Sequence, residues 1–423
     1  MKSLLVFLLL SSLAGFAQIA PDTAQKMVTG RTNDPAQLHK PYLIVILADG
    51  FGYDLAKKHH AGELLKRSEQ GVSADFMKPA FPSLTLANLY CIATGLYPAH
   101  NGIVDNIFYD PGKQEKYEIG EKMVNDSSWY GGTPIWVLAE QQHLLSACFY
   151  WAGSEAAIKG VRPAYYYNYN TAIPISARIR AVGDWLSLPE QKRPHLILFY
   201  LPQADHAEHR FGPDAPETAA AVQLVDSTVA ALTKVADSVQ LPVNFIFLSD
   251  HGMAQVDTAK TPLLNLGDLI DLSKFIIPPE SNIIMHLYAK DRNAIAPAYR
   301  ALKAKAADYE VYLTGQTPGK WHYSTVDDEY GRLGDILLVA KPGKGLPFAK
   351  HNLPAANRGA HGYDNDEATM RATFYAWGPA FRTHLKIGSF ANVDVYPLMA
   401  KILGLNPDGK TDGSLQIVKN MLK

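Results

Sequence analysis

Ala80-Phe-Pro-Ser-Leu-Thr-Leu-Ala-Asn88 is the stretch around which the rest of the chain is organised. Thr85 lies where an apolar run gives way to a predicted helix over 86–94, so its hydroxyl would face backbone N–H groups that lack partners. A threonine hydroxyl is a poor nucleophile at pH 7 unless a base or a metal removes its proton. The stretch therefore predicts an anion site at which the Thr85 hydroxyl needs activation before it can act as a nucleophile. Asn106, farther along the chain, belongs to the same predicted site.

Outward from this stretch, short apolar runs alternate with helical patterns. The runs are continuous rather than alternating, which is typical of strands buried on both faces of a parallel or mixed sheet. They cover residues 43–47, 147–151, 196–201, 245–248, 336–340 and 373–377. Between them, Thr133-Pro134 indicates one helix start, and Asp214 with Glu217 has the capping-box spacing ahead of a long helix through Val239. The pattern predicts an α/β fold with a doubly wound central sheet flanked by helices.

Residues from about 255 to 360 break this rhythm. They contain Pro278-Pro279, an alternating strand over 283–288 and several glycines, which indicates a smaller α+β lobe inserted into the chain and forming a wall of the cleft. The predicted organisation is a signal peptide over 1–17, a polar linker over 18–38, a catalytic domain over 39–410 and a C-terminal tail over 411–423.

The first 17 residues have one positive charge, a short apolar run and a small-residue finish at Ala17, which is typical of a secretory signal peptide. A membrane anchor is the weaker alternative, because the apolar run is shorter than the roughly 20 residues that a spanning helix needs. We expect an exported protein with no stable membrane anchor, in the periplasm or secreted. The 40 Lys and Arg against 41 Asp and Glu give no basic field, so no nucleic-acid polymer is expected as a partner.

Cys91 and Cys148 are the two cysteines of the chain, too few for a disulfide framework. Both fall in apolar segments and read as buried small hydrophobic residues, with a single bridge between them as the alternative.

Acidic and histidine side chains follow the predicted strands, and ligands in open α/β sheets bind beyond the carboxyl ends of the strands. Asp49, Asp250 and His251 are expected at strand ends, and the others in loops that reach the same edge. Each of these residues has an ordinary alternative when taken singly, such as a turn or a pair on a helix surface. Together they suit two zinc ions, because zinc takes Asp oxygen and His nitrogen. One ion would be held by Asp205, His209 and His361, and the other by Asp49, Asp250 and His251 with the oxygen of Thr85. Ligand type also admits manganese.

With these residues in place, the chain resembles a nucleotide pyrophosphatase/phosphodiesterase of the alkaline phosphatase superfamily. The resemblance runs from roughly Pro41 to Leu405 and includes Thr94-Gly-Leu-Tyr-Pro98, Gly102-Ile-Val-Asp-Asn106, Tyr109-Asp-Pro111 and Asn392-Val-Asp-Val-Tyr-Pro-Leu398. It implies a threonine nucleophile between two zinc ions, Thr85 by position, and a phosphothreonine intermediate. It also implies that the amide of Asn106 binds a phosphoryl oxygen, and that the six ligands are those named above.

The resemblance also bears on the substrate. Threonine-bearing monoesterases of this superfamily place Lys-x-Arg before a matching Ala-Ile, whereas this chain has Glu155 before Ala157-Ile158, which favours a phosphodiester monoanion. Leu86, Trp151 and Tyr169 are the predicted substrate-binding residues. Because Leu86 stands where nucleotide-cleaving relatives usually have Phe, the expected substrate is a small phosphodiester of one of three kinds: a nucleotide, a nucleotide sugar or a glycerophosphodiester.

Three other readings stay open at this point. An alkaline phosphomonoesterase would release inorganic phosphate from monoesters, and a phosphonoacetate-type hydrolase would carry extra Lys or His for a substrate carboxylate. A non-catalytic exported zinc-binding protein would bind metal without turning over any ester. A sulfatase is disfavoured because no Cys or Ser lies in the x-Pro-x-Arg context that makes formylglycine. The natural substrate and the oligomeric state do not follow from the sequence.

Overall fold

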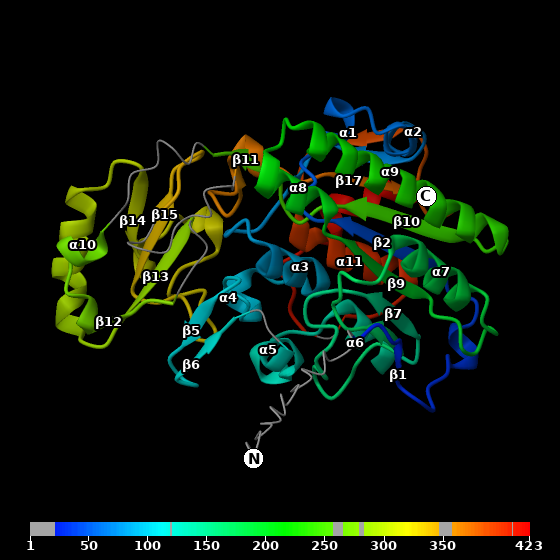
Figure 1. Cartoon of the computed structure of the whole chain (residues 1–423). Helices are drawn as coiled ribbons and strands as arrows, with labels where there is room; N and C mark the ends of the chain where they lie inside the picture. Colours follow the sequence, from blue (N-terminus) through cyan, green and yellow to red (C-terminus); the bar gives the residue numbers. More distant parts are fainter. Residues whose placement is uncertain (1–21, 119–120, 257–264, 279–282, 347–357, 408) are drawn as a thin grey trace, which may run out of the picture.

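The computed structural model describes residues 22–118, 121–256, 265–278, 283–346, 358–407 and 409–423 of the chain. Its centre is a nine-stranded mixed sheet (Figure 1), which confirms the predicted α/β class. In spatial order its strands are β1 (Lys26–Met27), β8 (Tyr165–Tyr167), β7 (Ser146–Phe149), β9 (Leu196–Leu201), β2 (Tyr42–Ala48), β10 (Val243–Leu248), β17 (Phe374–Trp377), β3 (Val72–Ala74) and β18 (Leu385–Ile387).

The five central strands, from β8 to β10, run parallel, and their register aligns their carboxyl ends. Leu47 of β2 pairs with Tyr200 of β9 on one side and with Leu248 of β10 on the other. All residues of β2, β9 and β10 are buried, as continuous apolar runs predict for strands covered on both faces. The loops that follow these three strands therefore emerge at one edge of the sheet.

Helices cover both faces of this sheet (Figure 1). One layer contains α1 (Leu55–Lys58), α2 (Gly62–Gln70), α7 (Ile175–Leu186), α8 (Gln203–Phe211) and α9 (Pro216–Ser238). The other contains α3 (Thr85–Thr94), α6 (Ile135–Gln141) and α11 (Val395–Leu403), with α4 (Pro98–Asn101), α5 (Glu121–Asn125) and α12 (Leu415–Val418) at its margins. This two-sided cover is the doubly wound arrangement that the sequence predicts.

Helix α9 is long and apolar enough, by length and composition alone, to cross a membrane, and it is the one described helix of that kind. It packs against α2, α7 and α8, and its buried residues include Val222, Val225, Val229 and Leu232. Packing onto the helical layer therefore explains its apolar composition.

The smaller lobe is a second sheet at one end of the molecule (Figure 1). Its order is β12 (Phe275–Ile276), β13 (Ile284–Ala289), β15 (Ile336–Ala340) and β14 (Tyr309–Leu313), and α10 (Ile295–Ala304) packs on it. Two expectations differ here. The run 336–340 belongs to this sheet and not to the central one. Strand β13 is buried from Ile284 to Tyr288 and does not alternate, because the side chains of His286 and Tyr288 are covered by contacts outside the sheet, with Asp105 and Tyr109.

Both ends of the described chain join the body of the protein. Residues 18–38 were expected to form a linker, yet β1 pairs with β8 at the edge of the large sheet, and 35–37 form a 3₁₀ helix. In the expected tail, α12 packs on α11, and Val418 and Met421 are buried. The predicted signal peptide, Pro279 and part of the segment between 255 and 360 lie outside the described residues.

Two helix starts also differ from the prediction. Helix α6 begins at Ile135, with Pro134 before its first residue. Helix α9 begins at Pro216, and no side chain caps it: Asp214 pairs with Lys58 instead, and the hydroxyl of Thr218 donates to the carbonyl of Gly212. The capping-box prediction is therefore wrong, because a tertiary ion pair takes the aspartate.

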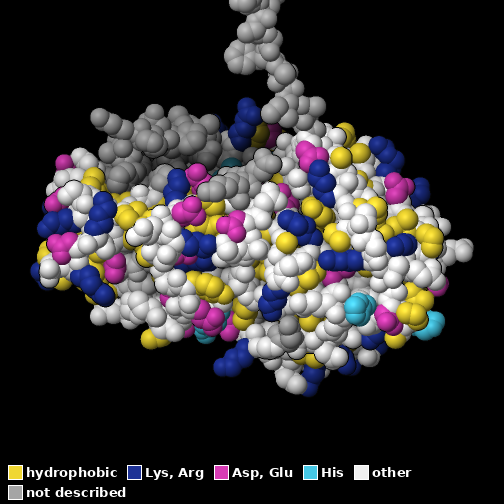
Figure 2. Space-filling view, turned by 90° about the horizontal axis from the view of Figure 1, so that it is seen from below, with side chains coloured by type: hydrophobic (Ala, Val, Ile, Leu, Met, Phe, Trp, Pro, Cys, Tyr) yellow, Lys and Arg dark blue, Asp and Glu magenta, His cyan; other side chains and the backbone are white. Residues whose placement is uncertain are grey.

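The surface seen in Figure 2 has Lys and Arg interspersed with Asp and Glu, without a continuous field of one sign. This agrees with the near-zero formal charge of the chain. Cys91 and Cys148 are free and buried, as the simpler interpretation predicted.

Candidate active site

The aligned carboxyl ends of β2, β9 and β10 bring three aspartates to one edge of the sheet. Asp49 follows β2, Asp250 follows β10, and Asp205 lies in the first turn of α8, directly after β9. His209 is one helical turn farther along α8, so the pair at i and i+4 faces the same side. The sequence predicted that Asp205 and His209 would come from a loop; a helix supplies them.

His361 reaches the same edge through a short antiparallel pair. Strand β11 (Ala254–Gln255), which follows His251, pairs with β16 (Gly359–Ala360), which precedes His361. As a result, the rings of His251 and His361 stack with a centroid distance of 3.7 Å. This two-residue ladder is what unites the last predicted ligand with the others.

The six predicted ligands form two adjoining groups. In the first, Nε2 of His209 lies 3.3 Å from Oδ1 of Asp205, and Nε2 of His361 lies 3.6 Å from the same oxygen and 3.1 Å from Nε2 of His209. In the second, Nε2 of His251 lies 3.4 Å from Oδ1 of Asp49 and 3.2 Å from Oδ2 of Asp250. Ligand atoms of Asp205, His251 and His361 also lie within 4.8 Å of one another, so His251 borders both groups.

The hydrogen bonds of the three histidines orient them as metal ligands. Each Nδ1 faces a backbone carbonyl: Gly359 for His209, Gly252 for His251 and Ser83 for His361, at 2.9 to 3.0 Å. Because a carbonyl only accepts, Nδ1 carries the proton and Nε2 presents its electron pair to the cluster. Two Nε2 atoms 3.1 Å apart, on His209 and His361, fit a cation bound by both.

The carboxylates also indicate a cation site. Asp49 Oδ1, Asp205 Oδ1 and Asp250 Oδ2 are buried and accept no hydrogen bond from a described residue. Their other oxygens are held in place: Asp49 Oδ2 accepts from the hydroxyl of Tyr200, and Asp250 Oδ1 accepts from the backbone of Gly50 and His251. Orphaned buried acceptors of this kind fit divalent cations.

The pKa values in the cluster are shifted in directions that also fit bound cations. Burial, with the neighbouring carboxylates of Asp250 and Asp205, raises the pKa of Asp49 well above its usual value. Burial, with His251 and His209, lowers the pKa of His361 well below its usual value. Burial opposes the ionisation of Asp205, yet the adjacent His209 and His361 lower its pKa. The cluster therefore combines crowded acids with a histidine, His361, that resists protonation, and bound cations would relieve both.

Thr85 is the first residue of α3 and adjoins the second group. Its hydroxyl lies 3.2 Å from Nε2 of His251 and donates to that electron pair. The next backbone N–H, that of Leu86, donates to Oδ1 of Asn106 at 2.9 Å. This bond fixes the orientation of the Asn106 amide, so that Nδ2, which bonds no described residue, is the free donor end. The structure therefore brings Thr85, Asn106 and the six ligands together.

Asn88 is a supporting residue that the sequence reasoning missed. Its Oδ1 accepts from the backbone of Ala80, and its Nδ2 donates to the carbonyls of Pro82 and Leu84. A buried Asn three residues after a helix start was the available signal. Phe81, in the loop so fixed, stacks on Trp321 of the smaller lobe with centroids 3.8 Å apart. The conformation of 80–88 is therefore held from both sides.

The predicted substrate residues differ in setting. Tyr169 is 48% exposed, its ring contacts those of Tyr150 and Tyr200, and its backbone N–H donates to the Glu155 carboxylate. Burial, followed by the charges of Asp49 and Asp205, raises the pKa of Tyr169, which places the ring near the cluster. Leu86 is half-buried, whereas Trp151 is 5% exposed and donates to the carbonyl of Leu89. Trp151 therefore supports α3 through this hydrogen bond. The substrate role of all three residues stays a prediction.

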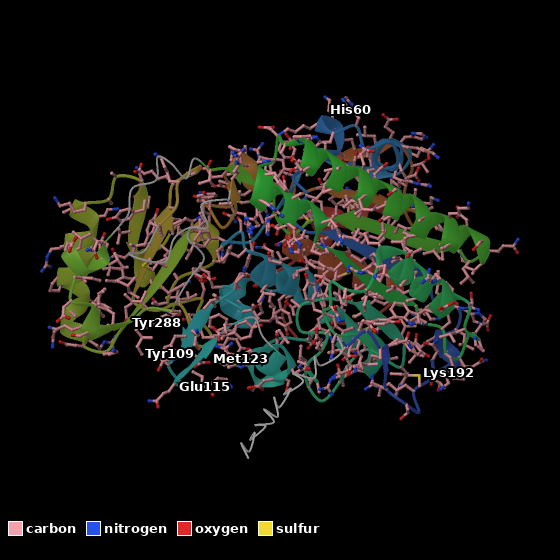
Figure 3. All side chains as sticks on the ribbon, in the orientation of Figure 1. His60, Tyr109, Glu115, Met123, Lys192 and Tyr288 are labelled. Carbon is pink, nitrogen blue, oxygen red and sulfur yellow. The ribbon has the colours of Figure 1, made fainter. Side chains whose placement is uncertain are left out.

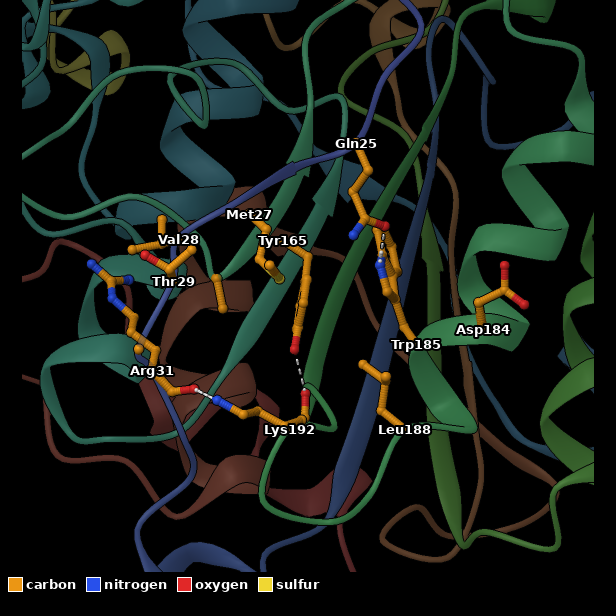
Figure 4. A pocket seen from close by; sticks show the side chains of 12 residues that line it. Gln25, Met27, Val28, Thr29, Arg31, Tyr165, Asp184, Trp185, Leu188 and Lys192 are labelled. Atoms are coloured by element: carbon orange, nitrogen blue, oxygen red, sulfur yellow. Dashed lines mark hydrogen bonds between the residues drawn. The ribbon is translucent and has the colours of Figure 1, made fainter.

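A separate cavity of about 510 Å³ lies between β1 and α7 (Figure 4) and contains none of these residues. Several of its polar groups pair with one another: Trp185 donates to Gln25, Tyr165 donates to the carbonyl of Lys192, and Lys192 donates to that of Arg31. The side chain of Asp184 also lines this cavity.

Comparisons with known proteins agree with this geometry. A family model described as type I phosphodiesterase/nucleotide pyrophosphatase matches residues 43–364. Venom phosphodiesterase 2 of Crotalus adamanteus is 32% identical over 404 residues, which cover 93% of this chain and 49% of that protein. The Homo sapiens ectonucleotide pyrophosphatase/phosphodiesterase family member 1 is 33% identical, covering 91% and 43%. The chain thus spans about half the length of these curated relatives.

A pyrophosphatase/phosphodiesterase of Schizosaccharomyces pombe is 32% identical over 416 residues, which cover 93% of this chain and 84% of that protein. Among solved structures, murine ectonucleotide pyrophosphatase/phosphodiesterase 5 superimposes with a TM-score of 0.83 at 27% identity, covering 90% of this chain and all of that one. An inactive variant of the same murine protein, in complex with AMP, gives a TM-score of 0.82.

Proposed function

Because the chain belongs to the type I phosphodiesterase/nucleotide pyrophosphatase family, we propose that it hydrolyses phosphodiester or phosphoanhydride bonds of small molecules, with Thr85 as nucleophile. The observation that carries the proposal is the position of the Thr85 hydroxyl, at the first residue of α3 and 3.2 Å from His251 of the second ligand group, with Asn106 bonded to the next residue of the helix. A nucleophile, a phosphoryl-binding amide and two cation sites at one helix start form the parts of a phosphoryl-transfer site.

Residues of the site have separate roles in the proposed reaction. The oxygen of Thr85 attacks phosphorus, the bond to the departing oxygen breaks, and a phosphothreonine forms; water then releases the phosphoryl group and restores the hydroxyl. Asn106 holds a nonbridging oxygen through Nδ2, because its Oδ1 is occupied by the N–H of Leu86. Backbone N–H groups at the start of α3 favour the same negative charge.

Two zinc ions complete the proposal. Asp205, His209 and His361 would hold one, and Asp49, Asp250 and His251 would hold the other, with Thr85 as an added ligand. When bound, zinc lowers the pKa of a coordinated hydroxyl or water and neutralises charge on attacking and leaving oxygens. The orphaned carboxylate oxygens and the inward-facing Nε2 atoms support this assignment.

A diester rather than a monoester is the proposed substrate. A monoester dianion gains from a cation that meets its additional charged oxygen. At the corresponding place this chain has Glu155, whose carboxylate accepts from the backbone of Tyr169 at 2.8 Å and would repel that charge. Tyr169 and Leu86 would contact the organic part of a nucleotide, nucleotide sugar or glycerophosphodiester. Export to the periplasm or the medium is part of the proposal and is supported by the leader pattern over 1–17.

Paired initial rates on bis-p-nitrophenyl phosphate and p-nitrophenyl phosphate, with zinc-loaded protein, test the function. We expect the diester rate to exceed the monoester rate and to fall about 10³-fold or more in Thr85→Ala, as losses of a nucleophile do. Thr85→Ser, which keeps a hydroxyl, should retain part of the rate.

Thr94→Ala is the matched control, because Thr94 ends the same helix and its hydroxyl donates to the carbonyl of Tyr90. It should keep the diester rate. A higher rate on the monoester would move the protein to the phosphomonoesterase class. Two bound zinc ions with no turnover of either ester would make it a binding protein.

A further inference from the structure

One contact between the smaller lobe and the candidate active site is a buried pair of side chains. His286 lies on β13 and Asp105 lies in the loop before β5 (Phe108–Asp110); they are 4% and 1% exposed. Nε2 of His286 is 3.1 Å from Oδ2 of Asp105. Tyr109 and Tyr288, labelled in Figure 3, lie beside this pair, where the hairpin formed by β5 and β6 (Glu115–Tyr117) meets the lobe. The pair joins residues that are far apart in the sequence.

His286 is held on both sides of its ring. Nδ1 lies 2.9 Å from the carbonyl oxygen of Leu333, and Nε2 faces the carboxylate of Asp105. The bond at Nε2 is made to a carboxylate and is therefore charge-assisted and directional.

Asp105 also holds the backbone of the next residue, Asn106. Its second oxygen, Oδ1, accepts from the backbone N–H of Asn106 at 2.6 Å and from that of Ile107 at 3.2 Å. One carboxylate thus binds the lobe with one oxygen and the backbone of Asn106 with the other. The side chain of Asn106 then accepts from the N–H of Leu86, the residue after Thr85. An unbroken series of hydrogen bonds therefore runs from β13 to the start of α3.

We propose that His286 is a positioning residue for Asn106, which it orients through Asp105, so that the smaller lobe sets the position of the amide that holds the phosphoryl group. The inference rests on the proposed function of Asn106. His286 touches no reacting atom; it fixes one end of a carboxylate whose other end fixes the backbone of residue 106. An amide that must meet charge developing in the transition state loses effect when its backbone is free to shift.

A second buried pair provides the comparison. Nε of Arg332, in the lobe, lies 2.8 Å from Oδ2 of Asp110 on β5, and both side chains are buried. This pair also docks the lobe on the hairpin, but neither residue bonds Asn106, Thr85 or a predicted metal ligand. Asp110→Asn therefore weakens docking without touching the series from His286 to Leu86.

The test measures steady-state hydrolysis of bis-p-nitrophenyl phosphate by the zinc-loaded full chain and three variants. We expect His286→Leu to lower kcat about 10-fold to 100-fold, the usual effect of losing such a supporting partner. KM should stay within about twofold, because the lost interaction acts in the transition state. His286→Gln, which can still donate to Asp105, should recover most of the rate. Asp110→Asn should lower the melting temperature while keeping kcat.

Calorimetric binding of orthovanadate, a mimic of the transferring phosphoryl group, gives a second readout that needs no turnover. Its dissociation constant should rise about tenfold in His286→Leu and stay unchanged in Asp110→Asn. Equal effects of the two variants on kcat and on vanadate binding would overturn the inference, because His286 would then only dock the lobe.

Failure of the proposed function has a different signature. An inactive wild-type protein would refute the proposed hydrolysis, while vanadate binding would still decide the role of His286. Should His286→Leu not fold, Asp105→Asn replaces it in the same assay. It keeps an oxygen for the N–H groups of residues 106 and 107 but loses the charge-assisted bond, so unchanged vanadate affinity in this variant would likewise overturn the inference.

Discussion

Gly50, which follows the predicted ligand Asp49, shows how closely single residues are constrained at this site. It has a φ of +69°, and a Cβ built on it would lie 2.9 Å from the Cα and 3.0 Å from the Cβ of Asp205. The end of β2 and the first turn of α8 are therefore in backbone contact at this point. Only glycine permits this approach, which brings Asp49 and Asp205 to the same cluster.

Gly50→Ala should therefore destabilise the protein more than its backbone angle alone requires. Gly30 is the matched control, because its φ is +79° and a Cβ there would meet nothing within 4 Å. Gly30→Ala should cost about 1–2 kcal/mol, the price of a left-handed L-residue. Gly50→Ala should cost about 1–3 kcal/mol more, because the clash forces β2 and α8 apart. Urea unfolding in chelator measures both losses without metal, and equal losses would contradict the close approach.

At the scale of an element, the start of α9 shows how tertiary contacts replace a local signal. Asp214 and Glu217 have the spacing of a capping box, but the Asp214 side chain, 73% exposed, pairs with Lys58 of α1. The helix start is held instead by Thr218, whose buried hydroxyl donates to the carbonyl of Gly212 at 2.7 Å. The residue that stabilises the helix start is thus inside the helix and not before it.

Substitutions at Asp214 and Thr218 should lower the free energy of unfolding by different amounts. Asp214→Ala should change the free energy of unfolding by less than about 0.5 kcal/mol, because exposed ion pairs contribute little. Thr218→Val should cost about 0.5–1.5 kcal/mol, because it removes the 2.7 Å bond and leaves the buried carbonyl of Gly212 with only the 3.3 Å bond from the N–H of Ala215. Urea denaturation of the two variants checks this order. A loss of about 1 kcal/mol or more in Asp214→Ala would restore the capping box.

At the scale of the whole molecule, the C-terminal segment is bonded to the body of the protein. Asp412 accepts from the backbone of Tyr97 and from Nδ1 of His100, both at 2.7 Å, just beyond α3. Arg382 also donates to the carbonyl of Leu422. The end of the chain therefore supports the far end of the helix that begins at Thr85.

The stability that the contact between Asp412 and His100 contributes should depend on pH. The hydrogen bond to Asp412, opposed by partial burial, raises the pKa of His100 above its usual value, and Asp327 lies 3.9 Å from Nε2. A raised pKa in the folded state adds stability that is complete below the unfolded pKa of about 6.5. That stability is lost as the pH rises through the folded pKa. The gain should stay below about 1 kcal/mol, because solvent screens this partly exposed pair.

Asp412→Asn should therefore lower the free energy of unfolding more at pH 6 than at pH 9. The loss that persists at pH 9 should be small, because an amide oxygen can still accept from Tyr97. In a His100→Gln background the difference between the two pH values should disappear. Unfolding curves of all four proteins at both pH values check this, and a difference that persists without His100 would assign the pH dependence to another group.

The sequence by itself determined the features that depend on local pattern and on residue chemistry. Continuous apolar runs such as 196–201 indicated buried parallel strands, and acids and histidines placed after them indicated a metal cluster at the strand ends. The roles of Thr85 and Asn106 followed from the resemblance to the phosphodiesterase family, and they stay predictions. These signals are short-range, so they survive without knowledge of the folded chain.

The tertiary structure alone decided which elements meet. The run 336–340 has the composition of a central strand, yet it pairs with β13 and β14 in the smaller sheet. His361 joins the cluster through the pairing of β11 with β16, and His286 reaches Asp105 across the boundary between lobe and body. Such contacts join residues that are far apart in the chain. Their free energy comes from burial and pairing that exist only once both partners have folded, so no local pattern encodes them.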